Sequence, residues 1–131
     1  MQCTEDPSPA VPADKAAVAL KGFRHIMAQW GCTEAEQKQL LGLSQTEFDE
    51  LTAEKSAEMP GQLLQRISYL MGIVRALDTL YPSDDRAAER IRKPTTDEPF
   101  CGLSPLAFML ADPQEGPRLT RRYFDWKAQD N

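Results

Sequence analysis

Apolar residues recur at intervals of three and four over most of this chain, which is the period of an amphipathic α-helix. Residues 15–30 form one such stripe, and Gly31 follows it as a predicted helix C-cap. A longer stripe covers residues 60–81, where Pro60 suits the first turn and Pro82 ends the helix. The stripes consist of Val18, Leu20, Phe23, Ile26, Met27 and Trp30, and of Leu63, Ile67, Leu70, Val74, Leu77 and Tyr81. We expect the longer helix to be the spine of the core.

Two short helices are predicted between these stripes, because two capping boxes occur there. The boxes are Thr33-Glu-Ala-Glu36 and Ser44-Gln-Thr-Glu47, in which a hydroxyl and a carboxylate each satisfy the other residue's backbone N–H. The first of these helices ends near Gly42 and the second near Ala53. Two short helices joined by a tight turn and resting on an earlier helix predict a helix-turn-helix layout.

Further helices are predicted towards the carboxyl end, again from local start and stop signals. Ser83 caps a short charged helix that ends before Pro94, and Ser104-Pro105 opens a short apolar helix. The last helix is expected over residues 117–127. Because no strand pattern occurs, we expect an all-α fold of six or seven helices.

The same signals divide the chain into three parts. Residues 1–14 hold three prolines among small and polar residues, which predicts a disordered tail. Residues 15–57 are expected to form the helix-turn-helix-like region, used for dimerisation or as a degenerate DNA-binding module. Residues 58–131 are expected to form a small helical domain for binding a partner.

The last helix combines arginines with aromatic residues. We expect Leu119, Tyr123 and Trp126 to seal this helix on the core, since they are spaced by four and three residues. Its polar side chains, Arg121, Arg122, Asp125 and Lys127, would then project outwards. Arg and aromatic residues are enriched where protein interfaces concentrate their binding energy, so the exposed side is a candidate partner surface.

The charge distribution argues against a nucleic-acid function for the first half. Of the net charge of −5, the whole deficit lies in residues 1–59, which carry five Lys or Arg against ten Asp or Glu, while residues 60–131 carry ten of each. Gln45 could read an adenine edge and Thr46 lies beside it, but the third helix carries four carboxylates and one lysine over residues 44–55. Phosphate binding rests on Lys and Arg, so a packing or dimerisation role is favoured there.

No pattern in the chain indicates catalysis. His25 is the single histidine, and neither a Gly-rich phosphate loop, a serine elbow nor an HExxH motif occurs. Three scattered cysteines predict neither disulfides nor a thiolate metal site. No apolar run is long enough for a membrane span, so we expect a cytoplasmic protein without cofactor, metal or enzymatic activity.

Five blocks in the second half, taken in order, form a more specific pattern. They are Arg66-Ile-Ser-Tyr-Leu-Met-Gly-Ile-Val-Arg-Ala-Leu77, Ile91-Arg-Lys-Pro94, Phe100-x-Gly-x-Ser-Pro-Leu106, Met109-Leu110 and Arg121-Arg-Tyr-Phe-Asp125. With them the chain resembles the Xre/MbcA/ParS antitoxins, well over residues 60–127 and loosely over 17–55. It departs from the family in its ending, where Lys127-Ala-Gln-Asp-Asn131 replaces a Gly-rich segment.

The resemblance implies an antitoxin of a type II toxin–antitoxin system. Its carboxyl-terminal domain would bind and occlude a RES-domain toxin, a class that degrades NAD⁺, and it would self-associate as a homodimer. The alternative is a DNA-binding transcriptional autorepressor of its own operon, with Gln45 and Thr46 as DNA contacts. The residues expected to bind the toxin are Phe100, Gly102, Ser104, Leu106, Arg118, Arg121, Arg122, Asp125, Trp126 and Lys127. The sequence does not indicate which face of the domain docks on the toxin. Asp97, Asp112 or Asp125 would take the place of NAD⁺ phosphates in the toxin's active site.

Overall fold

The computed structural model describes residues 13–52 and 60–130, and all regular structure in these residues is helical. The predicted all-α fold is therefore confirmed. The helices of this part are α1 (Ala13–Trp30), α2 (Glu34–Leu41), α3 (Gln45–Thr52), α4 (Gly61–Leu80), α5 (Asp84–Arg92), α6 (Pro105–Ala111) and α7 (Gly116–Asp130). Within the described residues, none of the helices combines the length and the apolar character needed to cross a bilayer.

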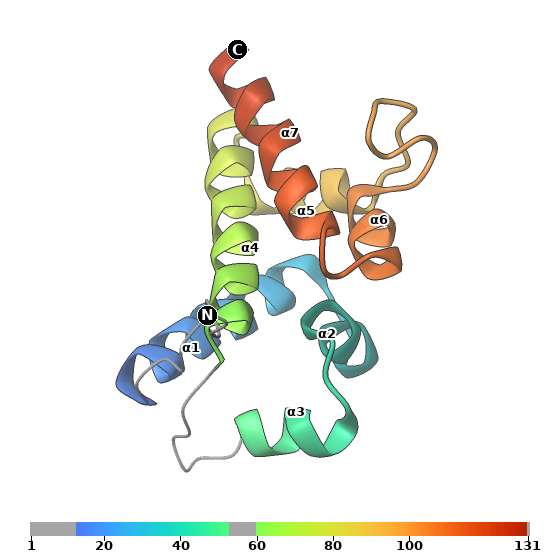
Figure 1. Cartoon of the computed structure of the whole chain (residues 1–131). Coiled ribbons are helices and arrows are strands. Elements are labelled where there is room, and N and C mark those ends of the chain that lie inside the picture. Colours follow the sequence, from blue (N-terminus) through green and yellow to red (C-terminus); the bar gives the residue numbers. More distant parts are fainter. Residues whose placement is uncertain (1–12, 53–59, 131) are drawn as a thin grey trace, which may run out of the picture.

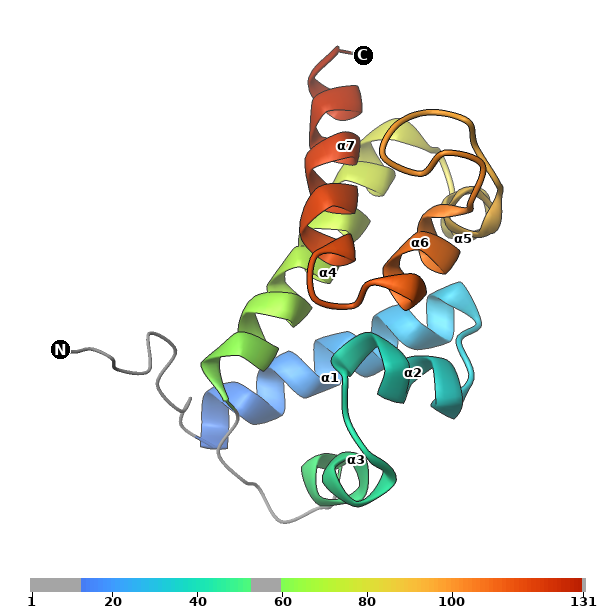
Figure 2. The same ribbon diagram turned by 45° about the vertical axis from the view of Figure 1, so that its right-hand side comes forward.

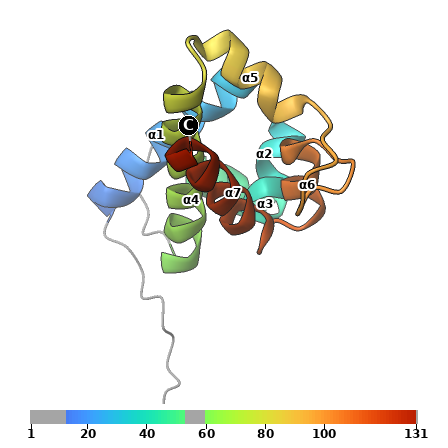
Figure 3. The ribbon, with the colours of Figure 1, turned by 90° about the horizontal axis from the view of Figure 1, so that it is seen from above.

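The two helices α4 and α7 run side by side in the same direction and form the axis of the molecule (Figure 1). Helix α1 crosses the lower part of α4, α2 lies beside α1, and α3 lies below them (Figure 2). Seen from above, α5 and α6 close the remaining sides around a common centre (Figure 3). The free end of α7 consequently points away from α2 and α3.

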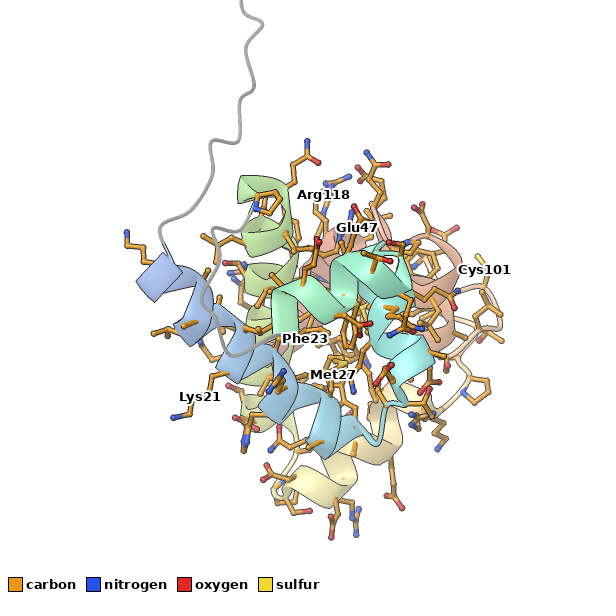
Figure 4. All side chains as sticks on the ribbon, turned by 90° about the horizontal axis from the view of Figure 1, so that it is seen from below. Lys21, Phe23, Met27, Glu47, Cys101 and Arg118 are labelled. Atoms are coloured by element: carbon orange, nitrogen blue, oxygen red, sulfur yellow. The ribbon has the colours of Figure 1, made fainter. Side chains whose placement is uncertain are left out.

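The core is one continuous cluster of apolar side chains to which all seven described helices contribute, completely buried at its centre. From α1 come Phe23 and Met27, on the side that faces the other helices, whereas Lys21 projects away (Figure 4). Helix α4 contributes the predicted spine. Its buried apolar residues are Leu63, Ile67, Leu70, Ile73, Ala76 and Leu77. A core shared in this way holds the amino-terminal and carboxyl-terminal helices together.

The helix ends follow the predicted capping chemistry. At the start of α2, the backbone N–H of Glu36 donates to Thr33 Oγ1 at 3.2 Å, and the backbone N–H of Thr33 donates to Glu36 Oε1 at 2.9 Å. The same pair of bonds joins Ser44 and Glu47 before α3. Gly42 ends α2 with φ of 70°, a left-handed conformation that glycine adopts without strain. Both capping boxes and the tight turn are therefore confirmed.

The amino-terminal expectations need two corrections. Helix α1 begins at Ala13, so two residues of the expected tail belong to it, while residues 1–12 lie outside the described part, as do residues 53–59 with the expected end of the third helix. Val18 is 71% exposed, whereas Ala16 and Ala19 are buried. The prediction favoured the larger side chain, but small residues let this end of α1 pack closely on its neighbours.

Of the residues predicted to seal the last helix on the core, Tyr123 is buried and Leu119 is half-buried, but the prediction was wrong for Trp126. Trp126 is 59% exposed, whereas Thr120, Tyr123 and Phe124 are buried, together with Pro117 in the first turn of α7. Phe124 faces the Phe100 ring, with centroids 6.4 Å apart, and this contact fixes the rotation of α7 about its axis. Since 200° of helical rotation separate residues 124 and 126, burying Phe124 turns Trp126 outwards.

Candidate partner-binding surface

The turn between α6 and α7 sets α7 against α4. Asp112 makes this turn, because its carbonyl accepts from the Gly116 backbone at 2.6 Å and its carboxylate accepts from the Glu115 backbone at 3.2 Å. A side chain at Gly116 would place its Cβ 2.7 Å from Met109 Cα, so only glycine fits the close approach of α6. Helix α7 then continues along α4 with Arg and Trp on its outer side.

A shallow groove, called here the α4–α7 groove, follows the outer side of these two helices. Two adjoining depressions form it, and they share Tyr69 and Arg118. One is lined by Tyr69, Arg118, Arg121, Arg122, Asp125, Trp126 and Gln129, and the other by Gln62, Gln65, Arg66, Tyr69, Gln114, Glu115 and Arg118. The groove is therefore rich in guanidinium and amide groups and holds two aromatic rings.

Two of the groove's α7 arginines form ion pairs with carboxylates three or four residues away in the chain. Arg118 binds Glu115, with Nη2 and Nε at 2.5 and 2.8 Å from Oε1, and Arg121 Nε lies 3.4 Å from Asp125 Oδ2. Such exposed pairs add little stability, at most about 1 kcal/mol each, but they orient the guanidinium planes. Arg122 makes no ion pair or hydrogen bond with the part of the chain that the structure describes, so its guanidinium is available.

Gly72 of α4 lies beneath the side chain of Arg121 on α7. An added Cβ at Gly72 would lie 2.7 Å from both Cδ and Cζ of Arg121, so the Arg121 side chain lies directly over this glycine. In sequence, a glycine inside a helix either marks a close approach by a neighbouring element or is merely tolerated, as at Gly72. The structure supports the first.

The groove brings together half of the residues that the sequence assigned to partner binding. Arg118, Arg121, Arg122, Asp125 and Trp126 all line it. Their role as contacts stays a prediction, but their common location on one face makes that role physically consistent.

The other predicted contact residues lie elsewhere. Phe100 is 1% and Leu106 is 3% exposed, so both are core residues and cannot touch a partner in this conformation. The Phe100 ring packs edge-on against Tyr123, with centroids 4.9 Å apart. Ser104 caps α6 by accepting from the Ala107 backbone at 3.0 Å, whereas Gly102 is exposed in the preceding loop. Lys127 lies over the Tyr123 ring, 5.9 Å from its centroid, outside the groove lining.

The α4 side of the groove was missed by the sequence reasoning. Gln62, Gln65, Arg66 and Tyr69 line it, but none of them was among the residues predicted to bind a partner. A signal was present, since polar positions 62, 65, 66 and 69 recur by threes and fours between the core positions. This spacing identifies the exposed face of α4. It does not reveal that α7 lies beside that face, because α7 follows more than thirty residues later in the sequence.

Beside the groove, Tyr123 ties the loop before α6 to α7. The Tyr123 hydroxyl donates to Asp97 Oδ2 at 2.5 Å, and Arg90 Nη2 donates to the Tyr123 oxygen at 3.4 Å. Burial, followed by the hydrogen bond to Asp97, raises the pKa of Tyr123 to about 12, so the phenol keeps its proton. Asp97, one of the expected phosphate mimics, is thus engaged within the chain.

The expected DNA contacts lie on an acidic surface. Gln45 Nε2 donates to Asp49 Oδ1 at 2.8 Å and to Glu34 Oε2 at 3.3 Å, while Lys38 Nζ donates to Gln45 Oε1. Both polar atoms of the Gln45 amide are therefore engaged, whereas Thr46 is exposed. The exposed charges of α3 are Glu47, Asp49 and Glu50, and α3 contains no Lys or Arg. This face repels phosphates.

Comparison with known proteins addresses the other end of the molecule. Residues 9–72 match the antitoxin Xre-like helix-turn-helix domain. The matched region includes α1, α2 and α3 and extends into α4, so the predicted helix-turn-helix is confirmed. The chain is also 26% identical, over 90% of its own length and 90% of the relative's, to uncharacterized protein y4oB of Sinorhizobium fredii. No solved structure matches the chain.

The match to the Xre-like helix-turn-helix domain supports an antitoxin or a DNA-binding role. Within residues 13–52 and 60–130, no group of three or more His, Cys, Asp and Glu side chains is arranged to hold a metal ion. Since the match ends at residue 72, all of α7 lies outside the matched region.

Proposed function

We propose that this chain is the antitoxin of a type II toxin–antitoxin pair, and that it binds a RES-domain toxin and covers the toxin's NAD-degrading active site in the cytoplasm. The observation that carries the proposal is the exposed Arg and Trp surface of α7, which lies outside the Xre-like helix-turn-helix domain. Trp126, at 59% exposure, and the arginines beside it on α7 are the residue types in which protein interfaces concentrate their binding energy.

The resemblance seen in the sequence supports the same assignment. Its Phe100 to Leu106 block builds the loop and the start of α6, and its Arg121 to Asp125 block lies on α7. We propose residues 58–131 as the toxin-binding part and residues 15–57 as a region through which two copies associate. Inhibition would then be steric, with the antitoxin acting on a neighbouring protein and not on a substrate.

Co-expression with a RES-domain toxin encoded beside this gene tests the proposal. We expect the full chain to restore growth and cellular NAD⁺ and to co-purify with the toxin. The double variant Arg122→Ala/Trp126→Ala should lose both effects, while Val18→Ala, an exposed apolar change on α1, should retain them. Absence of a complex with the wild-type chain would refute the proposed function.

A second candidate function is autorepression of the operon, which the Xre-like helix-turn-helix match favours. A mobility-shift assay on the upstream DNA at several salt concentrations tests it, because binding through phosphates weakens steeply as salt rises. Gln45→Ala and Thr46→Ala should then weaken sequence-specific binding. The acidic surface of α3 opposes this function, so we place it second.

A further inference from the structure

We propose that the α4–α7 groove receives a helical segment of a partner protein that carries carboxylates one turn apart, and that Gly72 positions Arg121 to meet it. The proposal deepens the proposed function, on which it rests for the identity of the partner. Its basis is the arrangement of the groove's guanidinium groups, which none of the comparisons describes.

The groove's cations are prepared for binding before a partner arrives. Arg118 and Arg121 are held by Glu115 and Asp125, so a ligand need not immobilise long free side chains. Arg122 adds an unpaired guanidinium beside them. Arg118 and Arg122 are four residues apart on α7 and therefore project from adjacent turns of one face. Carboxylates with the same spacing on a docked helix would meet both, and guanidinium binds carboxylate through two parallel hydrogen bonds.

The shape of the groove suits a helix as the ligand. Its two depressions adjoin along the neighbouring parallel helices α4 and α7 and share Tyr69 and Arg118, so a helix lying along them can contact both. Tyr69 from α4 and Trp126 from α7 supply aromatic surface, while Gln62 and Gln65 supply amide groups on the α4 side. Aromatic residues and arginine together are the composition of energetic interface centres.

A protein segment fits the groove better than a nucleic acid. Glu115 and Asp125 place two carboxylates among the arginines, and these would repel a continuous row of phosphates. A helix can avoid them, since its carboxylates occur only at chosen positions. An acidic helical segment is therefore the occupant to which we commit.

Gly72 determines where Arg121 lies. Because an alanine Cβ would overlap the Arg121 stem, Gly72→Ala would push this side chain away from α4 and out of its present position. The helix itself should tolerate the change, since alanine has the higher helix propensity and the contacted atoms belong to a flexible side chain. Gly22→Ala is the matched control, because its Cβ would meet only the end of another flexible side chain, Met71 Cε at 2.5 Å, on the α1 side.

The test uses the tryptophan emission of the full chain. Trp126 is exposed and Trp30 is 3% exposed, so a ligand in the groove should change the emission of Trp126, and Trp126→Phe should abolish the response. The first probe is a short helical peptide with glutamates at i, i+4 spacing, compared with the same peptide carrying glutamines. We expect the glutamate peptide to bind and the glutamine peptide not to bind, and we expect the affinity for the glutamate peptide to fall as the salt concentration rises.

Variants then test the positioning role. Arg122→Ala, Arg121→Ala and Gly72→Ala should each weaken binding about fivefold, the upper range for an exposed ion pair, while Gly22→Ala should not. The double variant Gly72→Ala/Arg121→Ala should bind no more weakly than Arg121→Ala, since both changes remove the same contact. Additive losses, or equal losses in Gly22→Ala, would show that Gly72 acts only through packing and would overturn its role.

Three results would overturn the groove proposal: equal binding of the glutamine peptide, no response to the acidic peptide, or tighter binding of a single-stranded oligonucleotide. The same variants are then assayed in the toxin complex. A complex that survives all of them leaves the proposed function standing and refutes the groove as its site. Groove-dependent binding of the acidic peptide without any toxin complex refutes the proposed function and supports the groove.

Discussion

Arg66 joins the helix-turn-helix to α4, and replacing it by methionine tests this connection. Arg66 Nη1 donates to the carbonyl of Leu41 at 2.7 Å and, more weakly, to that of Leu40 at 3.4 Å. These are carbonyls of the last turn of α2, which have no partner within the helix. The site is half-buried, and this burial lowers the pKa of Arg66 against the opposing effect of Asp112.

The expected loss follows from the shorter bond. A hydrogen bond from a charged donor contributes about 1.5–3 kcal/mol, and water will replace part of it at a half-buried site. Arg66→Met keeps the apolar stem, so we expect the free energy of unfolding to fall by about 1.5 kcal/mol. The rate of amide hydrogen exchange should increase more in α2 than in α7, because the lost hydrogen bond anchors α2.

Urea unfolding measures the loss, and Arg75→Met on the same helix is the control. Arg75 is exposed, and its change should alter stability by no more than about 0.5 kcal/mol. Equal stability of Arg66→Met and Arg75→Met would refute the anchoring role. An increase in exchange spread evenly over the chain would refute the local origin of the effect.

Three further predictions concern the core and its titrating groups. Phe100→Ala should lower the free energy of unfolding by about 3–5 kcal/mol, since a fully buried ring is lost, and a loss under about 1 kcal/mol in urea unfolding would contradict its burial. The free energy of unfolding should fall as the pH rises above about 10, because the folded chain holds the Tyr123 proton up to about 12 and the unfolded chain releases it earlier. The urea midpoint of Tyr123→Phe should fall less over the same pH range, and an identical fall would exclude Tyr123 as the cause. Burial, together with the charge of Glu36, raises the pKa of Cys32 to about 11. In a Cys3→Ser variant at about pH 8, iodoacetamide should therefore label the exposed Cys101 before Cys32. Faster labelling of Cys32, followed by mass spectrometry, would contradict this.

The helix ends could be predicted from sequence because their chemistry is local. A capping box needs two residues three positions apart, and both Thr33 with Glu36 and Ser44 with Glu47 make the bonds that their spacing indicates. The Ser104 cap and the stop at Gly42 are local in the same sense. The cap bonds themselves join residues of a single turn, so the local sequence contains the information they need, although the distant Arg92 also pairs with Glu36 at 3.3 Å.

The buried faces were harder to predict, because a distant residue decides between alternatives. On α7, the set with Trp126 and the set with Phe124 both have helical spacing. Phe100, in a loop preceding α6, packs with Tyr123 and Phe124 and selects the second set. The helical period predicts that one face of a helix is buried, whereas the residues packed against the helix determine which face this is. The α4 side of the groove was missed for the same reason.

Toxin binding and DNA binding, the two proposed functions, both depend on one shared apolar core. Removing the helices of one region therefore also disturbs the other region. Phe23 and Met27 of α1 belong to the same buried cluster as Ile67 of α4, and Arg66 lines the groove while it anchors α2. Deleting residues 15–57 would expose the apolar side of α4 and free Arg66 at once. A truncated chain that fails to bind a toxin would then report lost packing and not lost contacts. Exposed point changes on α3 and α7 separate DNA binding from toxin binding, because neither reaches the shared core.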